Sequence, residues 1–377
     1  MPSAVHGLSR RAALLLVAGS LTGLSLPRVP PQASGAGPAA PAAADPTGRL
    51  LAAHAAALRA GPLAGLPLAE FGYRETARDA STLRVELAYR FQGFDDYPAL
   101  LQRRFALTAD GGLGPESPAP QGPAAPWDAG PVRLAHGRLC LVLGAEQAEL
   151  TELAGVADRA VPAVSGVWGT DWAGRLVLQL PATEDQFAQL LAVSPDAYQD
   201  MAAVTSAAAG APVHTPADRI MVNPAVYREL SAVGKQVVTT HEATHVATRA
   251  DTHPWTPLWL SEGVADYTGY LATGRTARQI APELAADVAA GRIPSVLPVD
   301  ADFRAGSTGI AQAYEQGWLA CDLIARGYGQ PKLVAFYRAV GAAGPDVDLD
   351  RVFQQQLGCT LAAFTRQWIA ETVRQLG

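Results

Sequence analysis

The stretch HEATH, residues 241–245, places two histidines four residues apart around a glutamate. Residues four apart lie on one face of an α-helix, so the imidazoles of His241 and His245 can occupy two corners of a tetrahedral zinc site. Glu242 lies about 100° around the same helix, beside such a metal but not directed at it. This position suits a general base that takes a proton from water activated by the metal.

A second segment, which follows HEATH in the sequence, can supply a further ligand to the predicted zinc site. The sequence PLWLSEGVADYTGYLATG reads as a helix, with Thr256 as its cap and Pro257 in its first turn. Glu262 in this segment can supply a third metal ligand, and Asp266, one turn later, can accept the free ring N–H of a ligand histidine. Three protein ligands leave one corner of the tetrahedron for water, which is the arrangement of catalytic zinc.

The histidines continue an apolar pattern. Over residues 227–249, apolar side chains recur at three- and four-residue steps, and His241 and His245 fall on the same stripe. Burying these histidines and Glu262 without a metal or other partners would be costly, because polar groups lose their hydration. The pattern therefore argues against a chance occurrence of HExxH.

Other elements are predicted around this helix. Residues 45–61 carry helix start and stop signals, and the alternating sequences STLRVELAYRFQGF and LQRRFALTADGG predict strands of a small antiparallel sheet. The proline-rich residues 114–128 read as a linker. Beyond them a hairpin, the strands GRLVLQLPA and DRIMVNPA, and many helical segments predict an α+β architecture.

Three parts are expected along the chain. Residues 1–44 form an export signal and an Ala/Pro-rich leader, residues 45–125 form a small helix-plus-sheet domain that ends in the linker, and residues 126–377 form the larger α+β domain. The small domain faintly resembles folds of the nuclear transport factor type. No motif fixes that resemblance.

The motifs of the larger domain resemble those of a known family. The succession RIMVNP, HEATHVATR, PLWLSEGVADY and AYEQGW is similar to gluzincin zinc metallopeptidases, in particular to the bacterial peptidase MA-like family, over residues 215–340. The resemblance implies a zincin-like catalytic domain, in which an antiparallel edge strand lines the cleft beside the HExxH helix. It also implies zinc-dependent hydrolysis of peptide bonds.

The resemblance assigns roles to individual residues. It makes His241, His245 and Glu262 the zinc ligands, Glu242 the catalytic base, and Asp266 the partner of a ligand histidine. The segment RIMVNP becomes the strand that holds an extended peptide by backbone pairing.

The same stretch contains competing metal ligands. The longer metzincin pattern would put the third ligand at Asp251, but it requires a glycine where this chain has Thr248, so Glu262 is favoured. His253 is a further candidate. Its place beside a proline in a connecting loop is more typical of an exposed histidine.

Hydrolysis also requires a donor to the oxyanion that develops on the scissile carbonyl. Tyr314, in the segment AQAYEQGWLACDLIARGYG, is the candidate, and a tyrosine of the core is the alternative reading. Tyr267 and Tyr270 are weaker choices.

The first residues indicate export. Arg10 and Arg11 precede an apolar stretch from Ala12 to about Leu26, which is too short and too glycine-interrupted for a membrane span. It is typical of a signal for the general secretory or the twin-arginine route. No later stretch reaches spanning length, so we expect a protein that is secreted or associated with the cell envelope.

The net charge indicates the class of binding partner, and the cysteine spacing indicates the state of the thiols. The net charge is -6 with no long basic run, so nothing favours nucleic acid, and a peptide or protein substrate is expected instead. Cys140, Cys321 and Cys359 have no metal-binding spacing. Buried free thiols are favoured over a bridge between Cys321 and Cys359.

Two functions are compatible with these residues. The first is an exported zinc metallopeptidase, favoured because both the base and an open coordination position are present. The second is a secreted binding protein whose zinc site is structural or catalytically silent.

Overall fold

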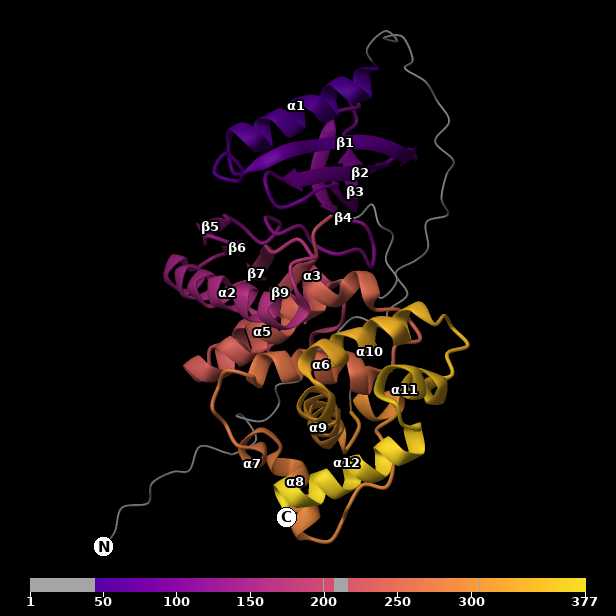
Figure 1. Cartoon of the computed structure of the whole chain (residues 1–377). Coiled ribbons are helices and arrows are strands. Elements are labelled where there is room, and N and C mark those ends of the chain that lie inside the picture. The colour runs from indigo at the N-terminus through magenta and orange to yellow at the C-terminus, as the bar shows by residue number, and fades with distance from the viewer. Residues whose placement is uncertain (1–44, 199, 207–215, 305) are drawn as a thin grey trace, which may run out of the picture.

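The computed structural model describes residues 45–198, 200–206, 216–304 and 306–377 (Figure 1). The predicted export signal and leader lie outside the described residues. Within them the chain is a mixed α+β structure with a helical C-terminal half, as the sequence indicates.

The first part of the chain is a helix on an antiparallel sheet. The strand order is β1-β2-β3-β4. In β2 every second side chain is buried, including Leu83, Val85 and Leu87, which is the period expected of a half-buried strand. The elements are α1 (Pro46–Ala60), β1 (Leu68–Arg78), β2 (Thr82–Phe91), β3 (Ala99–Leu107) and β4 (Leu113–Pro118).

Strand β4 begins the segment that the sequence predicts as a linker. Its backbone pairs with β3, and the pairing ends at Pro118, opposite Arg103. A proline at the end of an edge strand leaves the ladder intact, because its missing N–H is not needed there. The prediction of a linker from the proline-rich composition therefore missed a short strand.

A mixed five-stranded sheet follows, with the order β5-β6-β7-β9-β8. The three inner strands are parallel, and both edge strands run antiparallel to their neighbours. β6 and β7 are buried almost throughout, as expected of parallel strands covered on both faces. The strands are β5 (Arg133–His136), β6 (Cys140–Gly144), β7 (Leu176–Leu180), β8 (Ala203–Thr205) and β9 (Arg219–Val222).

Helices cover this sheet and build the rest of the molecule. Figure 1 shows α2 and α5 beside the sheet and the orange and yellow helices stacked beyond them. Among the described helices, none combines the length and the apolar character needed to cross a bilayer. The longer helices are α2 (Gln147–Trp168), α3 (Glu184–Leu191), α5 (Ala232–Thr248), α6 (Leu258–Tyr270), α8 (Pro282–Ala289), α9 (Ile310–Tyr328), α10 (Gln330–Ala342), α11 (Leu349–Leu357) and α12 (Leu361–Leu376). Single-turn α-helices are α4 (Pro224–Tyr227) and α7 (Ala277–Ile280).

The two sheets share a core and a buried ion pair. Apolar side chains of both sheets form one cluster, which includes Leu87 of β2 and Val177 of β7. Beside it, Arg219 of β9 donates two hydrogen bonds to Asp95, which follows β2, with Nη–Oδ distances of 2.7 and 2.8 Å. These contacts join the part before residue 125 to the part after it. The domain boundary near residue 125 stays a prediction.

Breaking this pair is expected to destabilise the fold. In Asp95→Asn the Arg219 guanidinium stays buried without an ionised partner, so the free energy of unfolding should fall by about 3–5 kcal/mol. The matched control is Glu86→Gln, which breaks a pair with Arg74, whose side chain is 70% exposed, and should cost less than about 1 kcal/mol. Urea unfolding followed by circular dichroism measures both. Equal, small losses would show that the buried pair contributes little.

Candidate metal centre

Helix α5 carries the HExxH sequence through the centre of the molecule. Ser231 caps its first turn by accepting a hydrogen bond from the Gly234 N–H. From Val237 to Thr248 nearly every side chain is buried, because α5 packs against α2, α6 and β8. The histidines therefore lie on a helix that is enclosed on several sides.

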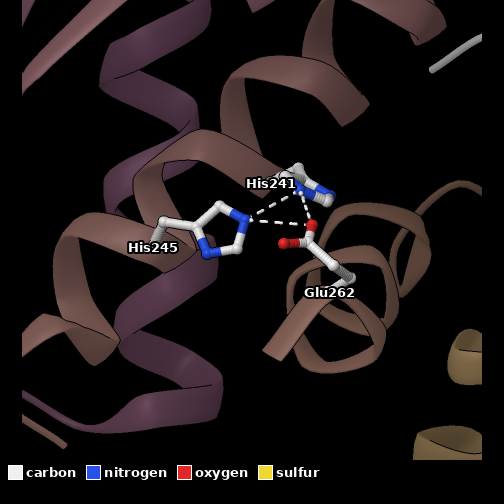
Figure 2. A group of neighbouring side chains, drawn as sticks. All are labelled: His241, His245 and Glu262. Atoms are coloured by element: carbon white, nitrogen blue, oxygen red, sulfur yellow. Dashed lines mark hydrogen bonds and ion pairs between the residues drawn. The ribbon is translucent and has the colours of Figure 1, made fainter. Parts of the chain in front are cut away.

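Three side chains from α5 and α6 converge, as Figure 2 shows. Glu262 Oε2 lies 3.2 Å from His241 Nε2 and 3.3 Å from His245 Nε2, and the two Nε2 atoms are 2.9 Å apart. Atoms bound to zinc at about 2.0–2.2 Å at the corners of a tetrahedron lie about 3.3–3.6 Å apart. The observed separations approach that spacing, with the two rings slightly closer. Among the described residues, this is the group whose donor atoms could hold a metal ion.

A neighbouring carboxylate orients one of the rings. His241 Nδ1 lies 2.8 Å from Asp266 Oδ1, and a carboxylate can only accept, so Nδ1 carries the proton. Nε2 is then the ring atom of His241 that is directed at Glu262. A cation at this place, either a proton on Nε2 or a metal ion between the two side chains, stabilises the ionised carboxylate in the buried site.

The pKa shifts follow from the same geometry. Burial disfavours the charged form of His241, but the carboxylates of Asp266 and Glu262 outweigh burial and raise the pKa of its ring. Burial also opposes the ionised form of Glu262, yet the two histidines outweigh it and lower the pKa of that carboxyl. The site thus favours a positive charge beside an ionised Glu262. A divalent cation can supply that charge.

The side chain of Glu242 is directed toward Thr205 of strand β8. It is completely buried, and burial is the main cause that raises its pKa. Thr205 of β8 donates a hydrogen bond from Oγ1 to Glu242 Oε2 at 2.5 Å. Thr205 was not among the candidates from the sequence, because its surroundings, AAVTSAAAG, show neither a strand period nor a motif.

The strand beside α5 differs from the expected one. The resemblance made RIMVNP the strand that holds an extended peptide by backbone pairing. However, β9, which spans Arg219–Val222, is paired with β7 on one side and with β8 on the other, so its backbone is not free to bind a peptide. Among the described strands the edge is β8, Ala203–Thr205, which runs antiparallel to β9. That assignment was wrong because strand order depends on long-range pairing, which RIMVNP alone does not encode.

Tyr314 lies on α9, which packs against α6. Close approach of these helices depends on Gly263 and Gly317: a Cβ on Gly317 would lie 2.8 Å from the Trp259 carbonyl oxygen, and one on Gly263 would collide with the Gly317 backbone. Burial raises the pKa of Tyr314 well above its usual value, and the next contribution comes from the Glu262 carboxylate. The phenol therefore keeps its proton near neutral pH.

The competing candidates lie elsewhere. Asp251 pairs with Arg338, at an Oδ2–Nε distance of 3.3 Å. His253 stacks on Trp255, with ring centroids 4.6 Å apart. Tyr267 donates to Gln330 of α10 at 3.3 Å.

Two further sequence-based expectations can be compared with the structure. Thr256 does not cap α6. Its hydroxyl accepts from the His253 N–H, and Asp300 accepts from the Leu258 N–H in the first turn. The cysteines of the described chain are free thiols, as favoured from the sequence, so no bridge joins Cys321 to Cys359.

Comparison with known proteins gives distant structural similarities. No protein-family model matches the sequence, and neither does any curated protein. An M1 zinc metallopeptidase from Deinococcus radiodurans matches with a TM-score of 0.39 and 18% identity, over 80% of this chain and 59% of that one. A variant of this peptidase, bound to a Tyr-Ser-Ala substrate, matches with a TM-score of 0.39 and 18% identity, over 80% of this chain and 60% of that one. A variant of a two-domain M1 zinc metallopeptidase, bound to L-arginine, matches with a TM-score of 0.40 and 16% identity, over 80% of this chain and 59% of that one. This chain thus spans about 59% of the length of the first of these structures.

Proposed function

We propose that this protein is an exported, zinc-dependent metallopeptidase that hydrolyses peptide bonds, with a zincin-like catalytic part in residues 126–377. The observation that carries the proposal is the convergence of two imidazoles and one carboxylate, spaced at 2.9–3.3 Å, next to a buried second carboxylate. His241, His245 and Glu262 would hold the metal. Export rests on the sequence of the first residues alone.

The donor set fits zinc. Two neutral imidazoles and one carboxylate are the protein ligands of several catalytic zinc sites, and Asp266 would fix the His241 ring through its Nδ1–H. When bound, zinc supplies Lewis-acid polarisation of a carbonyl oxygen and makes water more acidic.

The chain's own residues would supply the proton transfers. Glu242 would take a proton from the attacking water and return it to the leaving nitrogen, and its raised pKa suits both steps. Tyr314, protonated because of burial, would donate a hydrogen bond to the carbonyl oxygen as negative charge develops there.

The edge of the mixed sheet would hold the substrate. β8 pairs with β9 along one side, and among the described residues no strand pairs with its other side. An extended peptide can add to such an edge through backbone hydrogen bonds. β8 therefore replaces β9 in the role that the sequence suggested.

Metal analysis and peptide cleavage test the proposal together. We expect the purified mature protein to contain about one zinc ion per chain, to cleave members of a peptide library, to lose this activity with a chelator, and to regain it when zinc is restored. Mass spectrometry identifies the cleaved bonds. Firmly bound zinc without cleavage of any peptide would contradict a peptidase and favour the secreted binding protein.

A further inference from the structure

The side chain that holds Glu242 lies outside the group of metal ligands. Thr205 Oγ1 donates to Glu242 Oε2 at 2.5 Å, and the two residues have relative exposures of only 1% and 0%. The other carboxylate oxygen, Oε1, is buried as well, and none of the described residues hydrogen-bonds to it. The two oxygens of one carboxylate therefore have different surroundings.

We infer that Thr205 is a positioning residue: by engaging Oε2 it leaves Oε1 of Glu242 as the atom that takes the proton from water and passes it to the leaving nitrogen. A carboxylate oxygen that already accepts a strong hydrogen bond is the less basic of the two, because the bond stabilises its negative charge. The bond also restricts the terminal torsion of Glu242, which is otherwise broad. This inference rests on the proposed peptidase function.

The backbone of Thr205 adds a second link. Thr205 is the last residue of β8 and lies opposite Ile220 of β9. Its side chain orients the base, while its main chain belongs to the edge proposed to pair with the peptide. The same residue would thus orient the base through its side chain and belong to the substrate-binding edge through its main chain, which links the two parts of the proposed site.

Substitutions at this position separate the hydroxyl from the shape of the side chain. Thr205→Val keeps the shape and removes the hydroxyl, and it should lower kcat by about 10- to 100-fold with little change in KM or zinc content. Thr205→Ser keeps the hydroxyl and should stay within about threefold of the wild type. The matched control is Thr372→Val in α12, which removes a buried hydroxyl bonded to the Trp368 carbonyl and should leave kcat unchanged.

A second measurement uses the metal-free protein. Unfolding equilibria of Thr205→Val, Glu242→Met and the double variant form a cycle that isolates the interaction of the hydroxyl with the carboxylate. We expect Thr205→Val to shift the unfolding equilibrium constant about tenfold more in the presence of Glu242 than in its absence, because Oε2 then loses its buried partner.

Several outcomes would overturn the inference. Wild-type kcat in Thr205→Val, an equal loss in Thr205→Ser, a change confined to KM, loss of zinc, or additive stabilities would each show that the hydroxyl does not position the base. A wild-type protein that binds zinc but cleaves no peptide overturns the proposed function, and with it this role. An active wild type with unaffected Thr205 variants overturns the role alone.

Discussion

Replacing Glu242 by Gln is expected to lower kcat for peptide hydrolysis by about 10²- to 10⁴-fold, with zinc content unchanged. The amide keeps the volume of the side chain and an oxygen that can accept from Thr205, whose hydroxyl donates to Oε2 of the carboxylate. It cannot take a proton from water near neutral pH. Cleavage rates measured with one peptide substrate, together with atomic emission for zinc, give both quantities.

The control for this variant is an exposed acidic residue outside the metal group. Glu152 on α2 is 54% exposed in its side chain and pairs with Lys235, so Glu152→Gln should retain wild-type kcat. Full activity of Glu242→Gln would show that Glu242 is not the general base. Loss of zinc in the same variant would instead give Glu242 a structural role at the site.

Replacing Glu262 by Gln is expected to abolish stable zinc binding and, with it, hydrolysis. The carboxylate is the anionic donor of the group and lies 3.2 and 3.3 Å from the two Nε2 atoms. Losing it should weaken zinc affinity by more than the roughly 100-fold that follows loss of a residue that only supports a ligand. Competition with a fluorescent chelator measures the dissociation constant.

Thermal unfolding provides an independent readout for this variant. Free zinc at 100 times its dissociation constant should stabilise the wild type by about 2.7 kcal/mol, whereas the same zinc concentration should leave Glu262→Gln nearly unchanged. Asp251→Asn is the matched control and should bind zinc like the wild type, because Asp251 pairs with Arg338. The reverse pattern would support the metzincin assignment of the third ligand.

The sequence predicted those parts of the site that depend on local spacing. His241 and His245 are one helical turn apart wherever the helix forms, and the second helix presents Glu262 and Asp266 on the same face. The structure brings His241, His245 and Glu262 together and places Asp266 against the His241 ring. Their chemical roles still depend on the experiments above.

The remaining features depend on pairing across long stretches of chain. Thr205 lies 37 residues before Glu242 in a three-residue strand, which is too short for an alternating pattern to be recognised. The strand RIMVNP has the same composition whether it is inner or edge, so its place could not be read from its residues. The prolines around Pro118 suppressed the prediction of β4, since they count against a strand except at its edge or end.

The contact of Gly263 with Gly317 has a consequence for how substitutions are tolerated. Neither glycine carries a functional group, yet any side chain there would force α6 and α9 apart and shift Glu262 relative to Tyr314. In a saturation screen that scores proteolysis, these two positions should be as intolerant as the histidines. Alanine, the mildest replacement elsewhere, should already be disabling. The absence of a side chain at Gly263 and Gly317 is therefore as necessary for the placement of Glu262 as the residues that surround this carboxylate.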